Sequence, residues 1–184
     1  MIETESTRDK LLFAGKRLFW TRGFSNVTVR DIARESSADI ALISRYFGSK
    51  RGLFDATMDL LPALDAADFD GPEHLIDCLV KMFIEKPRLP NEPSEINMII
   101  ANAGDFEVGA VVHDLYRQKW QAPIEQIMGD PGRAAVLSAA LFGLMVAEKA
   151  MQLKGIAPHH TPKYEAQLRA LFGASLNVPM GCRC

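Results

Sequence analysis

The stretch 28–50, TVRDIARESSADIALISRYFGSK, constrains the fold most, because two short helical patterns lie in it with almost nothing between them. The Thr28 hydroxyl can cap the start of a helix, and Asp31 three residues later completes a pair that resembles a capping box. This pattern stops at Ser36, and a second one follows Asp39, another good capping residue. We therefore expect two helices joined by a short turn, and the second helix of such a pair can lie in a DNA major groove.

A set of residues at fixed spacing extends this pattern, without a gap, over about residues 11–54: Phe19, Gly23, Thr28, Ile32, Ala33, Tyr46, Phe47, Ser49, Lys50 and Leu53. The set resembles the DNA-binding segment of the tetracycline-repressor (TetR) family. The resemblance implies a three-helix DNA-binding domain in residues 1–51 and a helical regulatory, ligand-binding and dimerisation domain in residues 52–184. It also implies a transcriptional regulator: a homodimeric repressor that binds a palindromic operator in double-stranded DNA and responds to a small-molecule effector.

The stretch departs from the family pattern in three ways. Ser37 stands where the family usually has Gly in the turn, and a residue with a side chain carries a steric cost in a left-handed conformation. Asp39 stands where Ser or Thr is usual, and its charge suits the helix dipole but repels a phosphate. Ser44 and Tyr46 replace the usual Tyr and His of the recognition helix, so the family's base contacts do not carry over.

Charge is divided unevenly along the chain. The 184 residues carry a net charge of −2, yet residues 1–51 hold ten Lys and Arg against six Asp and Glu, a net +4. Residues 52–184 hold eleven against seventeen, a net −6. A basic head on an acidic body is expected where one end of a protein meets DNA, although chance alone can produce such a split.

Several other classes of function find no support in the sequence. HExxH, P-loop, GxGxxG and Cys-x-x-Cys motifs are absent, so we expect no enzyme, no cofactor and no metal site. The weak alternative is a metal set of His159 and His160 with Cys182 and Cys184, whereas Cys78 is expected to be core. The chain starts without an apolar run, and its longest apolar candidate, 134–147, is shorter than a membrane span. Three cysteines make no disulfide framework, which indicates a cytoplasmic protein without a membrane partner.

Helical spacing predicts about nine helices and no strand, which is an all-α fold. We expect the helices at residues 7–21, 28–36, 40–47, 50–61, 72–86, 94–103, 106–128, 131–154 and 162–176. Thr7, Ser49 and Ser94 are expected as caps, and Gly23 as the end of the first helix. The expected inner residues are Ile43 and Phe47 in 40–47, and Leu75, Leu79, Met82 and Phe83 in 72–86. Pro123 should kink the helix 106–128 near Lys119, whose carbonyl loses its amide partner. The acidic stretch 63–71 and PRLPNEP at 87–93 are expected to be loops.

Two sets of residues would contact DNA when the resemblance is carried over by position. The residues of the first set would face the bases or the groove wall: Ile40, Ala41, Leu42, Ser44 and Arg45. Those of the second set would anchor phosphates: Thr28, Arg30, Ser44, Tyr46 and Lys50. Arg45 could make a bidentate guanine contact, or it could be a solvated charge or phosphate clamp. Ile40 and Leu42 could meet thymine methyl groups, or they could pack on the first helix of the motif.

The dimer seam is expected in the last two helices, which form a four-helix bundle between subunits in the resembled family. Small residues recur every four positions in 131–154, and an apolar stripe follows in 162–176. The candidates are Ala135, Ala139, Gly143, Ala147, Leu168, Leu171, Phe172 and Ser175. The alternative is that both helices are core within one chain.

An effector pocket is implied by the resemblance, and its lining is drawn from apolar and aromatic residues with a few polar groups. The candidates are Met82, Phe83, Met98, Asn102, His113, Tyr116, Trp120 and Met145. Such stripes are more often core than pocket. The rival reading is a helical small-molecule-binding or scaffold protein that keeps the fold but lacks sequence-specific DNA binding, and salt-sensitive duplex binding separates the two.

Overall fold

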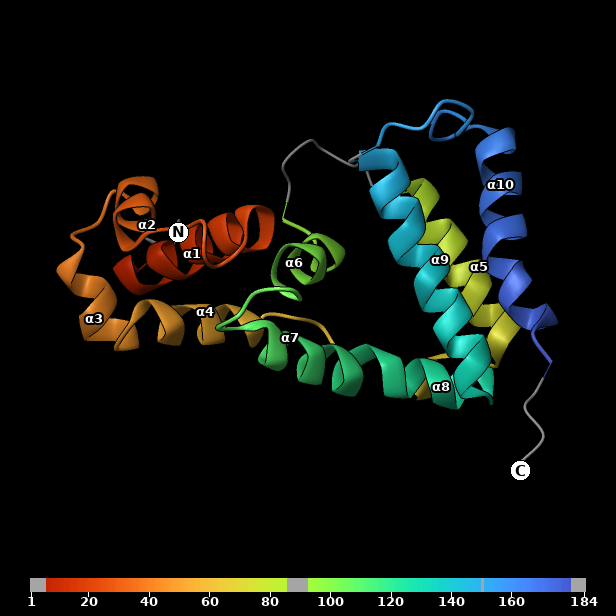
Figure 1. Cartoon of the computed structure of the whole chain (residues 1–184), viewed down its shortest axis with the longest axis horizontal. Coiled ribbons are helices and arrows are strands. Elements are labelled where there is room, and N and C mark those ends of the chain that lie inside the picture. Colours follow the sequence, from red (N-terminus) through yellow and green to blue (C-terminus); the bar gives the residue numbers. More distant parts are fainter. Residues whose placement is uncertain (1–5, 86–92, 150, 180–184) are drawn as a thin grey trace, which may run out of the picture. The chain divides into compact units, whose positions relative to one another are not determined.

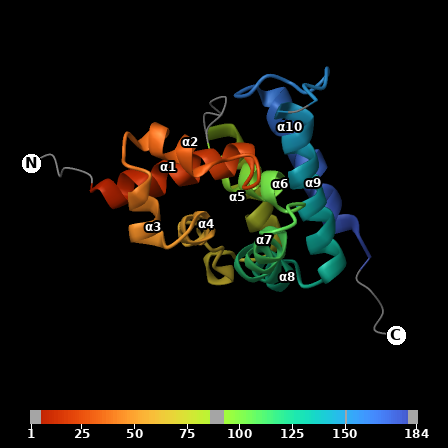
Figure 2. The same ribbon diagram turned by 60° about the vertical axis from the view of Figure 1, so that its left-hand side comes forward.

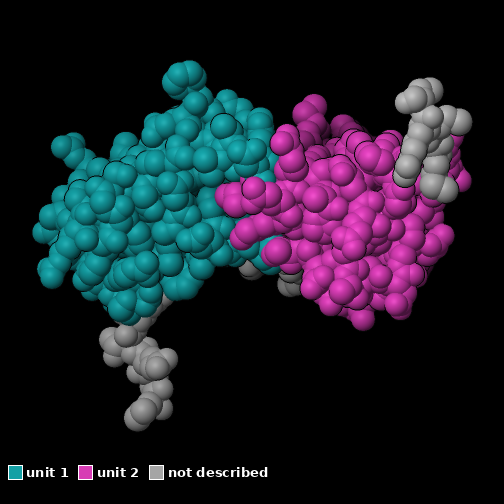
Figure 3. All heavy atoms as spheres, turned by 90° about the horizontal axis from the view of Figure 1, so that it is seen from below, with its two compact units in different colours: residues 1–62, 89–114 teal, residues 63–88, 115–184 magenta. Residues whose placement is uncertain are grey.

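The computed structural model describes residues 6–85, 93–149 and 151–179, which fold into helices joined by loops (Figures 1 and 2). No strand occurs among these residues, and one isolated bridge joins Lys154 and Ile156. The predicted all-α fold is confirmed. The chain divides into two compact units, residues 1–62 with 89–114 and residues 63–88 with 115–184 (Figure 3).

The first unit gathers its helices around α1 and an aromatic core. It is built from α1 (Thr7–Arg22), α2 (Val29–Ser36), α3 (Ala41–Phe47), α4 (Lys50–Met58), α6 (Glu95–Asn102) and α7 (Gly109–Tyr116), within which the chain passes to the second unit. The buried ring of Phe19 in α1 contacts those of Phe24 and Phe54, with centroids 5.6 Å and 5.5 Å apart. α1 also packs against α2, α4 and α6. The units therefore divide the chain elsewhere than the predicted domains 1–51 and 52–184, because α4 and α6 both pack on α1.

Local capping signals set several helix boundaries in the first unit. Ser6, rather than the expected Thr7, caps α1 by accepting a hydrogen bond from the Asp9 amide at 3.2 Å. Gly23 ends α1 with a φ of +84°, as predicted. Ser49 caps α4 and Ser94 caps α6, and both were expected from the sequence.

The second unit is an apolar helical body. It contains α5 (Pro72–Glu85), α8 (Ala122–Met128), α9 (Pro131–Lys149) and α10 (Pro162–Gly173), with 3-10 turns at Ala66–Asp68 and Ala174–Asn177. α10 packs against both α5 and α9 (Figures 1 and 2). Phe83 of α5 meets Phe172 of α10 edge to face, with ring centroids 5.4 Å apart. These buried rings form the contact between the two helices.

The helix expected to kink near Lys119 is interrupted there by a π-helical turn. Residues Arg117–Gln121 form this turn between α7 and α8. Proline has no amide proton, so Pro123 cannot donate to the Lys119 carbonyl. The Leu64 amide donates to that carbonyl instead, at 2.9 Å, and so ties the loop before α5 to the turn.

Three predicted helix ends are wrong. α4 ends at Met58 instead of residue 61, because Pro62 cannot donate to the Met58 carbonyl and the Leu61 amide takes it at 3.1 Å. α9 ends at Lys149 instead of residue 154, and Gln152 turns the chain in a left-handed conformation at φ +47°. α10 ends three residues early and tightens into a 3-10 turn.

Two further predictions for the middle of the chain need correction. The helix expected from residue 106 begins only at Gly109, and residues 106–108 form a turn in which the Glu107 and Val108 amides donate to Asp105. Leu79 and Met82 are not core residues, because the buried face of α5 consists of Leu75, Ile76, Val80 and Phe83. Residues 87–92, Cys182 and Cys184 lie outside the described residues.

Candidate nucleic-acid interface

The first helix of the motif is fixed by the predicted capping box. The Thr28 oxygen accepts from the Asp31 amide at 3.2 Å, and the Asp31 carboxylate accepts from the Thr28 amide at 3.0 Å. The Thr28 hydroxyl also donates to Asp31 at 2.6 Å, and this bond is the main cause that lowers the pKa of Asp31. The proton of the Thr28 hydroxyl, an expected phosphate donor, is therefore engaged within the cap.

The turn takes the left-handed conformation expected from the family pattern, although a serine occupies it. Ser37 has φ 53° and ψ 35°, and its amide donates to the Arg34 carbonyl at 3.3 Å. Asp39, two residues before α3 begins, then accepts from the Ala41 amide at 2.8 Å, whereas Ile40 at the cap position makes no side-chain bond of its own. The short turn therefore forms although Ser37 and Asp39 differ from the family pattern.

The second helix of the motif, α3, presents an outer face that is exposed to solvent among the described residues. Ile43 is buried and Phe47 is half-buried, so these two residues hold α3 against the other helices. The opposite side of the helix is exposed, and Ile40 and Tyr46 are 42% and 40% accessible to solvent. Of the remaining candidates for base contacts, Ala41, Ser44 and Arg45 are exposed and Leu42 is half-buried.

The basic residues of the motif divide into paired and available ones. Arg34 forms an ion pair with Asp31 at 2.7 Å, and Arg17 pairs with Glu35. Arg30 and Arg45 form no ion pair among the residues that the structure describes, and both are exposed. The Arg45 guanidinium lies 6.0 Å from the centre of the Tyr46 ring. These two arginines therefore keep their charge available to an anionic partner.

Lys50, an expected phosphate anchor, is partly withdrawn into the fold. Its ammonium lies 3.9 Å from the centre of the Phe24 ring, within cation–π range. Burial lowers the pKa of Lys50, while the charges of Glu107 and Asp105 act in the opposite direction. The sequence analysis did not identify these acidic neighbours, which come from the loop between α6 and α7. Asp105 could have been noticed as a potential capping residue before an expected helix.

The expected effector-pocket residues do not gather in one unit. Met98, Asn102 and His113 belong to the first unit, and Met82, Phe83, Tyr116, Trp120 and Met145 to the second. Asn102 is fully buried and accepts from the Phe24 amide at 2.7 Å, while its amide donates to Phe19 and Met98. His113 is exposed. In the second unit, the Tyr116 hydroxyl donates to Gln121 at 3.2 Å, and burial raises the pKa of Tyr116.

An apolar groove of about 510 Å³ runs between α9 and α10 in the second unit. Five of the expected dimer-seam residues line it: Ala139, Gly143, Ala147, Leu168 and Leu171. Ala135 is exposed outside it, whereas Phe172 and Ser175 are buried in the core. Residues 131–148 are also long and apolar enough to cross a membrane, but α9 packs against α8 and α10 as part of the helical body.

A metal centre finds no support in the part of the chain that the structure describes, because no three ligating side chains gather there. His159 instead stacks on Tyr164, with ring centroids 4.6 Å apart, and its Nε2 lies 3.9 Å from Glu148.

Comparison with known proteins places the motif in a family. Residues 11–57 match the family described as bacterial regulatory proteins, tetR family. A probable HTH-type transcriptional regulator of Bacillus subtilis (strain 168), YttP, is 42% identical over 50 residues, which are 27% of this chain and 24% of that protein. The matched stretch thus spans about a quarter of the curated relative.

Two solved structures that the chain matches are more distant in sequence. A putative TetR-family transcriptional regulator from Mesorhizobium loti MAFF303099 is 16% identical, with 93% of each chain covered and a TM-score of 0.48. A mutant of HlyIIR is 17% identical, with 99% of this chain and all of that chain covered and a TM-score of 0.40. The motif of α2 and α3, set on α1 and followed by α4, coincides with the matched residues 11–57, so this segment is similar to the tetR family of bacterial regulatory proteins.

Proposed function

We propose that the protein is a homodimeric transcriptional repressor of the cytoplasm that binds a palindromic operator. The observation that carries this proposal is the outer face of α3, which is exposed and polar at Ser44 and Arg45 while Ile43 fixes the helix from within. A helix that reads DNA needs short or polar side chains on its outer face and phosphate anchors around it.

The residues of the motif divide the work of DNA recognition. Ile40, Ala41, Leu42, Ser44 and Arg45 meet the groove, and Arg45 reads a guanine. Thr28, Arg30, Ser44, Tyr46 and Lys50 anchor phosphates; to do so, Lys50 leaves the Phe24 ring and the Thr28 hydroxyl leaves the Asp31 carboxylate. In this group Arg30 needs no rearrangement, because it is exposed and carries no ion pair among the described residues.

Two copies of the motif are needed for useful specificity, because one reads only a few base pairs. Heads spaced by about 34–36 Å can enter successive major grooves. The groove between α9 and α10 supplies the dimer contact, since its small residues let a helix of a second copy approach closely. Exposed apolar surface of this kind is typical of a protein–protein contact.

A small-molecule effector regulates this binding through a shift between arrangements of the two heads. A ligand that prefers a wider or narrower spacing lowers the affinity for the operator in proportion to that preference. The polar groups of the second unit around Tyr116 and Gln121 are the candidates that a ligand would engage there.

The test is selection of bound sequences from a pool of random duplexes at two salt concentrations. A recovered palindrome with a strong salt dependence supports the proposal. Binding without an enriched motif would favour instead a helical small-molecule-binding protein that has lost sequence-specific DNA binding. The specific observation behind that second candidate is the Asp39 carboxylate beside the start of α3, which repels phosphate.

Variants then locate the interface. We expect the pair Tyr46→Ala and Lys50→Ala to lose operator binding while dimerisation is unchanged. Because Lys50 also packs on Phe24, Arg45→Ala is a second variant that disturbs no buried contact. The matched control is the pair Phe13→Ala and Lys10→Ala, which removes an exposed aromatic residue and an exposed lysine from α1. Equal losses in both pairs would count against the assigned interface.

A further inference from the structure

The segment between α6 and α7 is bonded to the turn that opens the helix-turn-helix motif. Asn102, at the end of α6, accepts from the Phe24 amide at 2.7 Å and donates to the Phe19 carbonyl at 3.0 Å. These partners lie about eighty positions earlier in the chain. The Asn102 side chain is completely buried, so the contact is shielded from water. The end of α6 is thereby fixed to the end of α1.

Asp105, three residues later, has a carboxylate that joins two elements at once. One oxygen accepts from the Ser25 hydroxyl at 2.6 Å and from the Ser25 amide at 3.2 Å. The other oxygen accepts from the amides of Glu107 and Val108, at 2.9 Å and 3.2 Å, and so holds the turn 106–108 that leads into α7. Burial raises the pKa of Asp105, but these hydrogen bonds outweigh it and leave the pKa below its ordinary value.

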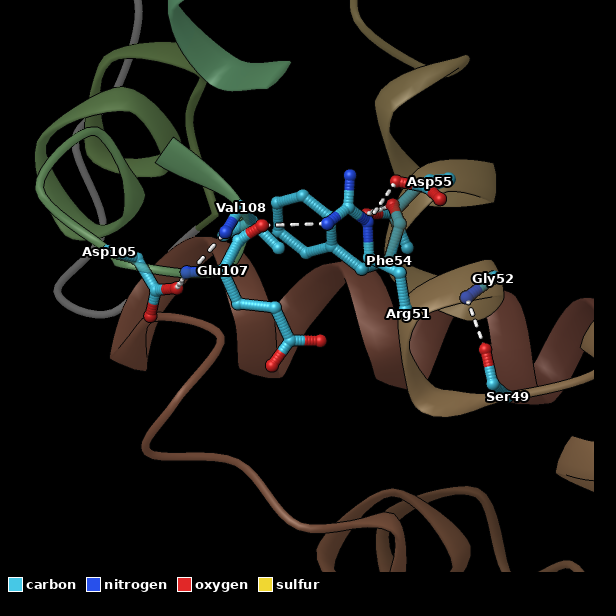
Figure 4. Close-up of polar contacts among 9 residues, drawn as sticks. Ser49, Arg51, Gly52, Phe54, Asp55, Asp105, Glu107 and Val108 are labelled. Carbon is cyan, nitrogen blue, oxygen red and sulfur yellow. Dashed lines mark hydrogen bonds and ion pairs between the residues drawn. The ribbon is translucent and has the colours of Figure 1, made fainter. Parts of the chain in front are cut away.

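A third contact reaches the same segment from α4. Figure 4 shows the Arg51 side chain between the Asp55 carboxylate and the Glu107 backbone. Its Nε donates to Asp55 at 2.8 Å and its Nη1 donates to the Glu107 carbonyl at 2.7 Å. The start of α7 is therefore bonded both to the turn before α2 and to the helix after α3.

We propose that Asp105 is a positioning residue that sets the orientation of the helix-turn-helix motif (α2 and α3, the head) with respect to α7. The same carboxylate fixes where α7 begins and where the turn before α2 lies, so the two cannot move independently while it is bonded. The chain passes between the two units at three places, and the last of them lies within α7, between residues 114 and 115. A displacement of α7 is thus passed to the head through Asp105, and in a dimer this sets the spacing of the two heads.

This inference rests on the proposed function, and its first test uses duplex libraries in which the half-site spacing varies. Asp105→Ala and Ser25→Ala should each reduce the preference for the best spacing over its neighbours by about 3-fold or more. The preferred bases within each half-site stay the same, because α3 is untouched. Asp65→Ala, which removes a similar cap in the second unit, is the matched control and keeps the wild-type spacing.

The variant Asp105→Asn separates positioning from simple capping. Asn is nearly as good a cap as Asp, but its amide nitrogen cannot accept from Ser25 where the carboxylate oxygen does. If Asp105→Ala alone changed the spacing while Asp105→Asn and Ser25→Ala behaved as wild type, Asp105 would be only a helix cap and the inference would fall.

A second readout needs no DNA. Spin labels at Phe13→Cys on α1 and His113→Cys on α7, both exposed positions, report the distance between head and helix once Cys78, Cys182 and Cys184 are replaced by Ser. We expect a narrow distribution that broadens with Ser25→Ala and Asp105→Ala. An unchanged distribution overturns the inference. A broadened one upholds it even if wild-type protein selects no motif, an outcome that refutes only the proposed function.

Discussion

The two units complete their surfaces in different ways. In the first unit, segments far apart in sequence are joined by hydrogen bonds, as at Asn102 and Asp105. In the second, α9 and α10 leave an apolar groove of about 510 Å³ with small side chains on its floor. The first unit is complete as a fold, whereas the second has a face that another helix would complete.

This difference predicts how each unit responds to concentration. Changes inside the first unit should alter stability by the same amount at every protein concentration. Changes in the groove should act through association, so that their effect on melting depends on concentration. The predictions below separate the two behaviours, and they are ordered by the size of the expected effect.

The largest effect is expected from a charge placed in the groove. Ala139→Glu puts a carboxylate where a second copy would bury it, which costs several kcal/mol. We expect the dissociation constant of the dimer to rise by about 100-fold or more, measured by analytical ultracentrifugation. Operator binding should fall with it to the level of a single head.

The matched control for this variant is Ala166→Glu on α10, an exposed position outside the groove. It introduces the same charge without burying it. Unaltered association with Ala139→Glu, or an equal loss with Ala166→Glu, would show that the groove is not the dimer seam.

The next largest effect is expected at Asn102. Asn102→Ala leaves the buried Phe24 amide without its partner and the Phe19 carbonyl with only the Gly23 amide, at a cost of about 3 kcal/mol. Urea unfolding should show this loss at every protein concentration. Asn26→Ala, which removes one exposed hydrogen bond to Arg22, should cost about 0.5 kcal/mol or less. Similar losses for both variants would mean that the buried contact does not hold the first unit together.

The predictable parts of this fold are those with short-range causes. The capping box of Thr28, the caps at Ser49 and Ser94, and the stop at Gly23 all depend on residues within four positions, and the structure confirms them. The break at Pro123 belongs to the same class, because it follows from the covalent structure of proline. Helical spacing also identified Ile43 as the inner residue of α3.

The parts that the sequence did not reveal have long-range causes. Asn102 and Asp105 form hydrogen bonds with residues that lie 78 and 80 positions away, and no local sequence pattern predicts such partners. The inner face of α5 was misassigned at Leu79 and Met82 because an apolar helix offers more than one possible stripe, and α10 decides which one is buried. The DNA contacts and the effector site remain predictions for the same reason, since their partners are outside the chain.

A smaller effect is expected at the turn of the motif. Ser37 pays for its left-handed conformation, so Ser37→Gly should stabilise the protein by about 0.5 kcal/mol. Its neighbour Ser36 is the last residue of α2, so Ser36→Gly should destabilise by about 1 kcal/mol. The opposite signs, measured by urea unfolding, should not depend on protein concentration. Equal signs would show that the turn is not strained at Ser37.

The smallest effect is expected from the titration of Asp105. Its pKa in the folded protein lies below the ordinary value of 3.8, so the ionised carboxylate stabilises the fold. That contribution is complete above the unfolded-state pKa and is lost as the pH falls through the lower folded-state pKa. Urea unfolding below about pH 5 should therefore weaken wild-type protein more than Asp105→Asn, by less than about 1 kcal/mol because solvent reaches the carboxylate. The carboxylate of Asp31 titrates in both proteins and cancels in the difference, which isolates Asp105. A difference that stays constant through this acid range would mean that the Ser25 contact does not depend on the charge of Asp105.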